Sequence, residues 1–174
     1  GDLTAMGKMI GGGFPIGAVA GRADVMDVMN PSAAQYLLPH SGTFSANPIS
    51  MVAGRIAMMH FDEAAVDHVN GLAARAMRGI DEAAKRTGAR ACVTGAGSIL
   101  RVHMKEAPPR NFREAYLSPE ENVRLKTMLD HLFDAGFVMI NTCSAMMSTP
   151  MTEADIDALV VACGEGFEKI SKMP

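Results

Sequence analysis

Residues 7–18 read GKMIGGGFPIGA, so a single lysine, Lys8, stands three residues before a run of three glycines, which a Pro-x-Gly follows. Glycine adopts left-handed conformations at little cost and lets other groups approach the backbone, which predicts a tight turn with room for a flat ring. A phosphate-binding P-loop has its glycines before the lysine and a hydroxyl residue after it, whereas Met9 follows Lys8. This order argues against a nucleoside triphosphate site, and leaves Lys8 as a reactive amine or an ordinary solvated charge.

A second polar stretch follows later in the chain, where residues 41–54 read SGTFSANPISMVAG. A helix is expected to begin at Asn47-Pro48, and helix N-termini with nearby hydroxyl groups bind anions. Taken alone, this stretch favours a simpler interpretation, which is a turn followed by a helix cap.

Together, residues 3–22 (LTAMGKMIGGGFPIGAVAGR) and 41–54 resemble the class III aminotransferases, which are pyridoxal-phosphate enzymes of fold type I. The closest likeness is to the branch that contains glutamate-1-semialdehyde aminomutase. The resemblance implies that Lys8 is the catalytic residue and forms the internal aldimine with pyridoxal 5'-phosphate. It also implies that Gly42 and Thr43 form the turn that reaches the cofactor phosphate, in that family from the neighbouring subunit of a homodimer with a shared active site.

The same resemblance implies amino-group transfer from a small-molecule amino donor to a keto or aldehyde acceptor, with the freed Lys8 amine moving the proton. Two alternatives stay open, an aminomutase that moves the amino group within one molecule and a catalytically silent fragment. Members of the family are more than twice as long as these 174 residues. The acid that pairs with the pyridine nitrogen, the ring-stacking aromatic and the second phosphate loop are therefore not assigned, and the chain alone is expected to be inactive.

Composition and charge exclude several other classes of function. The 16 basic and 19 acidic residues give a net charge of -3, and seven Phe, two Tyr and no Trp leave little for base stacking, so no nucleic-acid partner is expected. The longest apolar run near the C-terminus, ALVVAC, is far shorter than the roughly 18 residues of a membrane-spanning helix. No membrane partner is expected.

Cysteine and histidine spacing bears on metals and on the cellular compartment. Cys92, Cys143 and Cys163 form neither a CxxC pair nor a cluster with histidine, and the five histidines share no helix face. This spacing predicts no metal site, and an odd number of widely spaced cysteines fits a reducing, cytoplasmic setting.

The composition and periodicity of the sequence change near Phe61, which predicts two domains. Residues 1–61 are rich in glycine and proline, with helices expected near 22–30 and 48–60, and the chain is expected to begin within a domain. By the resemblance, residues 1–61 are the C-terminal part of the large cofactor-binding domain and residues 62–174 are the small C-terminal α/β domain. The predicted fold class is α/β, the C-terminal part of an aspartate aminotransferase-like transferase.

Periodicity and caps predict the elements of the second domain. Apolar residues from 62 to 86 recur with a 3.6-residue period, which indicates one long amphipathic helix. Ser118, Pro119 and Glu121 predict a capping box that starts a second helix, with an inner face ending at Leu132 and Phe133. The remaining expectations are two strands around residues 89–104, an exposed loop over 105–117, a strand over 137–140 and a last helix capped by Thr152.

Overall fold

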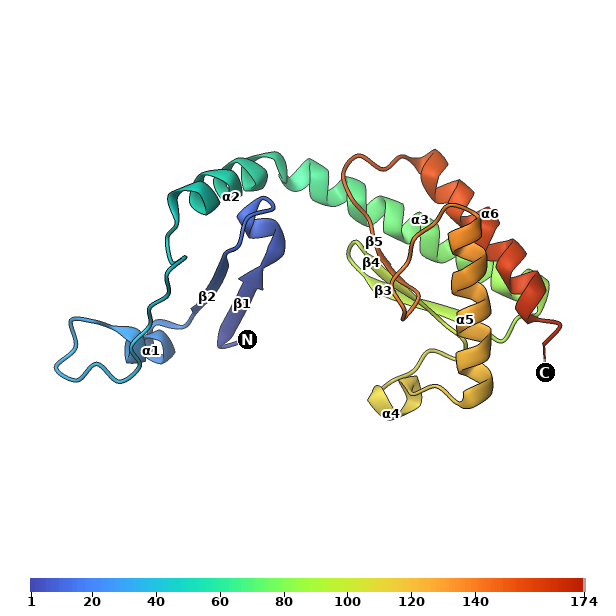
Figure 1. Ribbon diagram of the computed structural model, residues 1–174, viewed down its shortest axis with the longest axis horizontal. Coiled ribbons are helices and arrows are strands. Elements are labelled where there is room, and N and C mark those ends of the chain that lie inside the picture. Colours follow the sequence, from blue (N-terminus) through green and yellow to red (C-terminus); the bar gives the residue numbers. More distant parts are fainter. Residues whose placement is uncertain (174) are drawn as a thin grey trace. The chain divides into compact units, whose positions relative to one another are not determined.

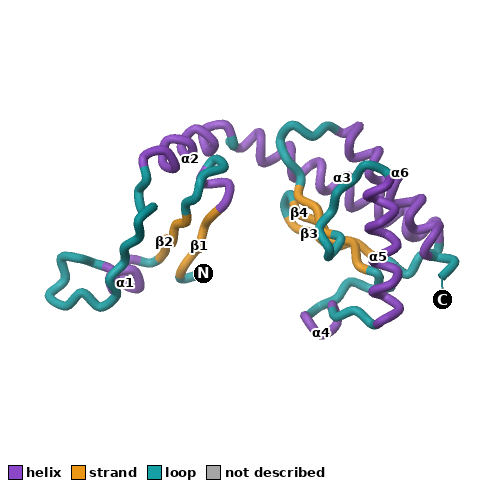
Figure 2. Tube along the Cα trace, in the orientation of Figure 1, coloured by secondary structure: helices purple, strands orange, loops and turns teal. Residues whose placement is uncertain are grey.

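The computed structural model describes residues 1–173, and the chain divides into two compact units, Gly1–Glu63 and Ala64–Pro174. Each unit contains both helices and strands, as Figures 1 and 2 show. The chain is therefore an α/β protein, as predicted.

The first unit is built on a two-stranded antiparallel ribbon. Strand β1 (Leu3–Gly7) pairs with β2 (Gly17–Gly21) in a register that runs from Leu3 opposite Gly21 to Gly7 opposite Gly17. The 3-10 helix η1 (Lys8–Gly11) continues directly from β1. Two short turns of helix follow the ribbon, α1 (Ala23–Met26) and η2 (Asp27–Met29).

Helix α2 (Pro48–His60) completes the first unit and begins where the sequence predicts. The Asn47 side chain caps it, since its Oδ1 accepts hydrogen bonds from the backbone N–H groups of Ile49 at 3.0 Å and Ser50 at 3.2 Å. Pro48 occupies the first helical position, where a missing N–H costs nothing. The two helices predicted for this part of the chain are both present.

The second unit contains a three-stranded antiparallel sheet in the order β3-β4-β5. The strands are β3 (Cys92–Ala96), β4 (Ile99–His103) and β5 (Ser144–Met146). The long helix α3 (Glu63–Thr87) precedes the sheet, α4 (Phe112–Ala115) and α5 (Pro119–Asp134) lie between β4 and β5, and α6 (Glu153–Ile170) follows.

Small residues allow the helices of the second unit to pack closely. A Cβ atom added to Gly79 of α3 would lie 2.7 Å from Val160 of α6, and one added to Gly166 of α6 would lie 2.5 Å from Met128 of α5. Helix α6 therefore packs against both α3 and α5. The largest fully buried side chains come from these helices and the sheet: Phe167, Ile80, Leu100, Met104, Met128, Leu132, Ile156 and Ile170.

Most predicted elements of this unit are confirmed. The predicted capping box of Ser118 and Glu121 is present, and the predicted cap at Thr152 proves to be a capping box with Asp155. The hairpin β3–β4 turns at Gly97, whose φ is 57°. The predicted loop over 105–117 contains one short helix, α4.

The strand predicted over residues 137–140 is wrong. The edge of β4 that this segment could have joined pairs with Ser144–Met146. Val138 and Ile140 are 83% and 61% exposed. The buried Cys143, with φ of 55°, turns the chain into β5, and its carbonyl accepts a hydrogen bond from Val102 N–H at 3.0 Å. A short apolar run does not reveal which of its neighbours will meet the sheet edge.

The prediction that Phe133 faces inward is also wrong, because Phe133 is 67% exposed. It follows Leu132, and the step of about 100° between neighbouring helical residues turns it away from the face that Leu132 buries. On β4, Leu100 and Val102 are buried, as expected for alternate residues on the inner face of a strand. On the opposite face of β4, however, His103 is buried as well.

Candidate active site

Lys8 occupies an unusual position at the junction of β1 and η1. Its φ is 53°, in the left-handed region, where a residue with a Cβ atom pays about 1–2 kcal/mol. The residue is exposed, and no hydrogen bond or ion pair joins its amine to any other residue between 1 and 173. Non-glycine residues with strained backbones cluster at functional sites, where surrounding structure enforces the conformation. The observed conformation therefore marks Lys8 as a candidate functional residue.

The glycines after Lys8 form the predicted left-handed turn. Gly12 and Gly13 have φ angles of 58° and 92°. Two backbone hydrogen bonds close the turn, from Gly12 N–H to the Met9 carbonyl at 3.1 Å and from Phe14 N–H to the Gly11 carbonyl at 3.0 Å. The turn reverses the chain so that β2 runs antiparallel to β1.

Only one of these glycines leaves open space for another molecule. A Cβ atom on Gly11 would lie 2.6 Å from Ile16 Cγ2, and one on Gly12 would lie 2.5 Å from the Ala53 carbonyl oxygen in α2. Gly13 has nothing within 4 Å of its Cβ position. The prediction that the glycines give a flat ring room to approach therefore fits Gly13, whereas Gly11 and Gly12 are required by internal packing.

Lys8 lies in a shallow hollow that it lines with Met9, Gly13, Phe14 and Pro15. The Phe14 side chain is 49% exposed and gives this hollow an apolar rim beside the amine. Neither Gly42 nor Thr43 lines the same hollow.

Gly42 and Thr43 lie in an exposed turn ahead of α2. The Gly42 carbonyl accepts a hydrogen bond from Ser45 N–H at 2.9 Å, and Ala46, with φ of 54°, leads the chain toward the Asn47 cap. Within residues 1–173, no hydrogen bond uses the backbone N–H groups of Gly42 and Thr43 or the Thr43 hydroxyl. These three donors are therefore available to an external acceptor.

Two residues behind the Lys8 turn were not predicted as part of the site, Ser50 and Gly54 of α2. Both are buried, and together with Gly11 they are the buried residues of the first unit. The Ser50 hydroxyl donates a hydrogen bond to the Pro15 carbonyl at 3.0 Å. The available signal was two small residues four positions apart, which lie on one face of a helix.

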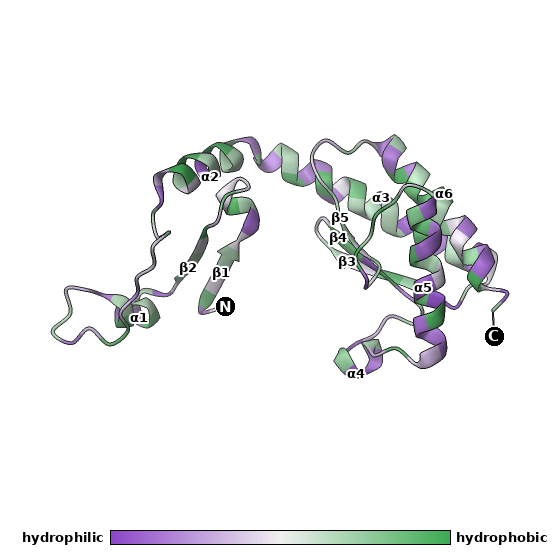
Figure 3. Cartoon of the chain, viewed as in Figure 1, coloured by the Kyte–Doolittle hydropathy of each residue, from purple (hydrophilic) through white to green (hydrophobic). Residues whose placement is uncertain are grey.

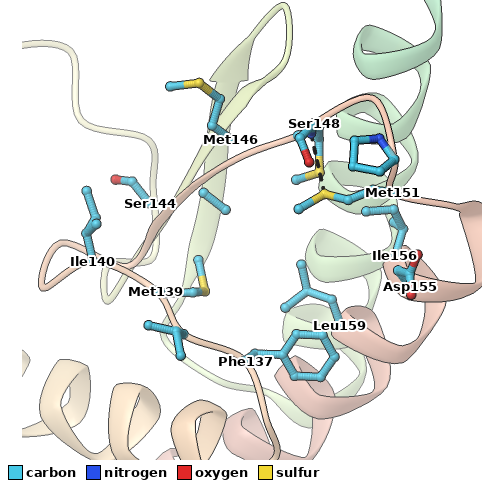
Figure 4. Close-up of a pocket in the computed structure, with 14 residues that line it drawn as sticks. Phe137, Met139, Ile140, Ser144, Met146, Ser148, Met151, Asp155, Ile156 and Leu159 are labelled. Carbon is cyan, nitrogen blue, oxygen red and sulfur yellow. Dashed lines mark hydrogen bonds between the residues drawn. The ribbon is translucent and has the colours of Figure 1, made fainter. Parts of the chain in front are cut away.

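A larger hollow lies wholly within the second unit and lacks the features of a catalytic site. It is a cavity of about 620 Å³ between residues 137–151 and the first turns of α6. Figure 4 shows Phe137, Met139, Met151 and Leu159 around it, with a hydrogen bond from Ser148 N–H to Met151 Sδ at 3.5 Å. Its charged residue, Asp155, already caps α6 through Thr152. The walls are otherwise apolar or hydroxylic, with neither lysine nor histidine.

The cysteines are poorly suited to nucleophilic chemistry. All three are free and buried. Burial raises the pKa of the Cys143 and Cys163 thiols to about 12, so neither is a thiolate near neutral pH.

His103 is buried in the sheet of the second unit, which disfavours its charged form. Burial lowers its pKa, and the positive charges of Arg101 and Lys105 add to this effect. Its Nε2 shares a hydrogen bond with the Thr94 hydroxyl at 2.8 Å across the β3–β4 pair.

Side chains that could bind a metal ion lie dispersed over the described residues 1–173. In that range, no group of three or more His, Cys, Asp or Glu residues is placed to bind a metal ion. No helix of the described chain combines the length and apolar character that a bilayer crossing requires.

Comparison with known proteins gives consistent matches along the chain. The sequence model of the family Aminotransferase class-III matches residues 1–164. Glutamate-1-semialdehyde 2,1-aminomutase from Desulforudis audaxviator is 35% identical over 169 residues, which cover 95% of this chain and 38% of that relative.

Two solved structures extend these matches to three dimensions. An omega-transaminase from Sphaerobacter thermophilus is 36% identical with a TM-score of 0.92, over 98% of this chain and 39% of that protein. A transaminase solved with PLP bound is 33% identical with a TM-score of 0.83, over 97% and 38% of the two chains. The chain thus spans about two fifths of the length of the proteins it matches.

Proposed function

The chain belongs to the class III aminotransferase family, and from this premise we propose that it is the part of a pyridoxal-phosphate-dependent aminotransferase that carries the cofactor-binding lysine, Lys8. The observation that carries the proposal is the geometry of Lys8, an exposed amine without a partner on a left-handed backbone. An ordinary solvated lysine has no need of that conformation, because a loop accommodates it at normal φ angles.

The residues present fit two parts of the cofactor. A primary amine beside open space at Gly13 suits attachment of an aldehyde, and the apolar Phe14 side chain in the same hollow suits contact with a ring. The free N–H groups of Gly42 and Thr43 and the Thr43 hydroxyl suit a phosphate, which accepts hydrogen bonds from such donors. The acid and the stacking aromatic that the family uses have no assigned equivalent in these 174 residues.

Pyridoxal phosphate, when bound, supplies an electron sink for bonds at the substrate carbon. Lys8 would anchor it through Nζ, and the same nitrogen, once free, would accept and return the proton of the substrate. The small-molecule substrates would be an amino donor and a keto or aldehyde acceptor.

We also propose that the protein acts as a homodimer with a shared active site. Neither Gly42 nor Thr43 lines the hollow that holds Lys8 in the same chain, which supports this arrangement. A mixing experiment tests it with Lys8→Ala and Thr43→Ala chains, each supplied with a complementing N-terminal polypeptide, and measures aminotransferase activity. If each site takes its lysine from one subunit and its phosphate donor from the other, mixed dimers regain one intact site, whereas sites within one subunit give no recovery.

An aminomutase reaction is the second candidate, and the similarity to a glutamate-1-semialdehyde 2,1-aminomutase favours it. The two reactions are distinguished by product analysis with an isotopically labelled amino group. Transfer to a second molecule supports transamination, and retention within the substrate supports the aminomutase.

A third possibility is that the chain by itself folds and assembles without catalysing a reaction. The exposed apolar ribbon of the first unit supports this view, because further polypeptide must cover it in a working site.

We propose that residues 1–61 belong to the cofactor-binding large domain and residues 62–174 to the small domain. The boundary between the two compact units at Glu63 supports this division. Three free, buried cysteines support a reducing, cytoplasmic setting.

The test of the proposed function is covalent trapping. The purified chain is incubated with pyridoxal phosphate and reduced with borohydride, and peptide mass spectrometry locates the label. We expect a pyridoxyl group on Lys8 that is lost in Lys8→Arg and retained in Lys126→Arg, a control for an exposed lysine paired with Asp130. Label spread evenly over the surface lysines would contradict the assignment, and a repeat with a complementing N-terminal polypeptide shows whether that part completes the pocket.

A further inference from the structure

The Lys8 turn is attached to helix α2 by a buried hydrogen bond. Ser50 is 1% exposed, and its hydroxyl donates to the Pro15 carbonyl at 3.0 Å. The ring of Pro15 fixes its φ angle, which removes one backbone rotation from the segment between the turn and β2. A buried hydroxyl that lost this partner would pay a desolvation cost.

Two glycines bring the backbones of the turn and the helix into direct contact. A Cβ atom on Gly54 would overlap the Ile10 carbonyl oxygen, and one on Gly12 would lie 2.5 Å from the Ala53 carbonyl oxygen. The contacts are therefore reciprocal, since each partner presents a glycine to the carbonyl of the other. Gly54 has an ordinary helical conformation, so this close approach is the observed reason for a glycine at that position.

These contacts bracket the residues that follow the lysine. The ribbon fixes the start of the turn, where Gly7 pairs with Gly17, and α2 fixes Ile10, Gly12 and Pro15. Lys8 lies between these constraints, on the η1 turn that ends at Gly11. A left-handed lysine persists only where the surroundings enforce it, and α2 supplies that enforcement on one side.

We propose that Ser50 and Gly54 are positioning residues for Lys8, which hold the turn after the lysine and thereby set the direction in which its amine leaves the backbone. The proposal rests on the proposed role of Lys8 as the cofactor-binding residue. Neither residue lines the hollow that holds Lys8, so both act through the Ile10–Pro15 backbone.

The test uses the full 174-residue chain and two variants of different severity. Ser50→Ala removes one hydrogen bond without adding an atom, and Gly54→Ala forces the Ile10 carbonyl away from α2. Gly71→Ala is the matched control, since Gly71 is also a helical glycine and nothing lies within 4 Å of its Cβ position. If Gly54→Ala fails to fold, Ser50→Ala still decides the question.

The first measurement reports the turn without the cofactor. Nuclear magnetic resonance gives the Lys8 Cα and Cβ chemical shifts, which identify a left-handed backbone, and amide exchange at Gly12 and Phe14 reports the two bonds that close the turn. Loss of one buried hydrogen bond is expected to speed this exchange roughly two- to tenfold in Ser50→Ala. Exchange of the α2 amides serves as an internal check that the helix stays formed.

The second measurement reports the amine. After borohydride trapping with pyridoxal phosphate, the share of label on Lys8 relative to Lys126 is expected to fall by a similar factor in Ser50→Ala, to fall further in Gly54→Ala, and to stay unchanged in Gly71→Ala. Unaltered turn exchange and Lys8 chemical shifts in Ser50→Ala and Gly54→Ala would overturn the inference. So would a looser turn whose Lys8 keeps its share of label, because Ser50 would then be structural only.

The two measurements separate the inference from the function on which it rests. If Lys8 and Lys126 are labelled equally in the unaltered chain, the proposed cofactor role of Lys8 is wrong. The chemical shifts then decide the inference alone: a Lys8 that loses its left-handed signature in the α2 variants supports positioning by α2, and a Lys8 that keeps it contradicts positioning.

Discussion

The two units of this chain differ in how their apolar residues are used. In the second unit, a sheet and three long helices bury a continuous set of side chains, and the buried hydrophobic residues run from Val69 to Ile170. In the first unit, every residue of β1 and β2 is exposed, although both strands are mainly apolar. Figure 3 shows hydrophobic residues along the ribbon and α2 as well as inside the second unit. The unit with the candidate catalytic lysine therefore has little core of its own.

This difference indicates that the two units gain stability from different sources. Strands that are apolar on both sides are typical of sheets covered on both faces. The exposed side chains of α2, which include Ile49, Val52 and Met59 at 62%, 59% and 64%, show the same pattern. The first unit places the candidate site among exposed apolar residues, whereas the second unit has a hydrophobic core of its own.

The largest effect is expected when the two units are produced as separate polypeptides. We expect residues 62–174 alone to unfold cooperatively in urea, because α3, the sheet and α6 stay intact, and residues 1–61 alone to give no cooperative transition. Circular dichroism and the dispersion of amide resonances measure both outcomes. A cooperatively folded 1–61 peptide would contradict the view that this unit lacks a sufficient core.

Side-chain truncation is expected to give the next largest effect. Leu100→Ala removes a side chain that is 0% exposed in the sheet, and should lower the free energy of unfolding by about 2–5 kcal/mol. Val52→Ala, at an α2 residue that is 59% exposed, should change it by less than about 0.5 kcal/mol. Urea denaturation of the whole chain measures both. Similar losses in the two variants would show that α2 is buried in the protein in solution.

The sequence predicted the local features of the second unit well and those of the first less completely. Ser118 and Thr152 identified two helix starts, because a capping box is a short-range signal. The strand over 137–140 was wrong because the choice of sheet edge depends on distant residues. The motif pointed to Lys8, but its left-handed φ and the contacts of Ser50 and Gly54 with the turn arise from residues about forty positions apart in the chain.

Two glycines of α3 allow packed and open surface to be compared within one helix. Gly79→Ala places a methyl group 2.7 Å from Val160 and should destabilise the second unit by about 1–3 kcal/mol through overpacking. Gly71→Ala meets no atom within 4 Å and should stabilise it by about 0.5–1 kcal/mol, since alanine is the better helix former. Thermal unfolding of both variants measures the pair. A gain in stability with Gly79→Ala would show that α3 and α6 are less closely packed than the structure has them.

The smallest effect is expected from removing the charge of one ion pair in each unit. Lys105 and Glu121 are 17% and 18% exposed in the second unit, whereas Arg22 and Asp2 are 59% and 71% exposed in the first. Burial tends to raise the pKa of Glu121, but hydrogen bonds from Lys105 and the Ser118 N–H outweigh it and lower the pKa overall. Glu121→Gln keeps the capping box, because glutamine also serves at that position, and removes only the charge.

We therefore expect Glu121→Gln to lower the free energy of unfolding by about 1 kcal/mol at pH 7, and Asp2→Asn to lower it by less than about 0.5 kcal/mol. The pKa of Glu121 is lowered on folding, so its charge contributes fully above its ordinary value of 4.5, and the contribution is lost as pH falls through the folded value. The difference between the unaltered chain and Glu121→Gln should thus shrink as pH falls below about 4.5, which urea denaturation at stepped pH measures. A difference that stays constant down to pH 3 would show that the charge of Glu121 is not its source, and an equal effect from Asp2→Asn would remove the distinction between the two pairs.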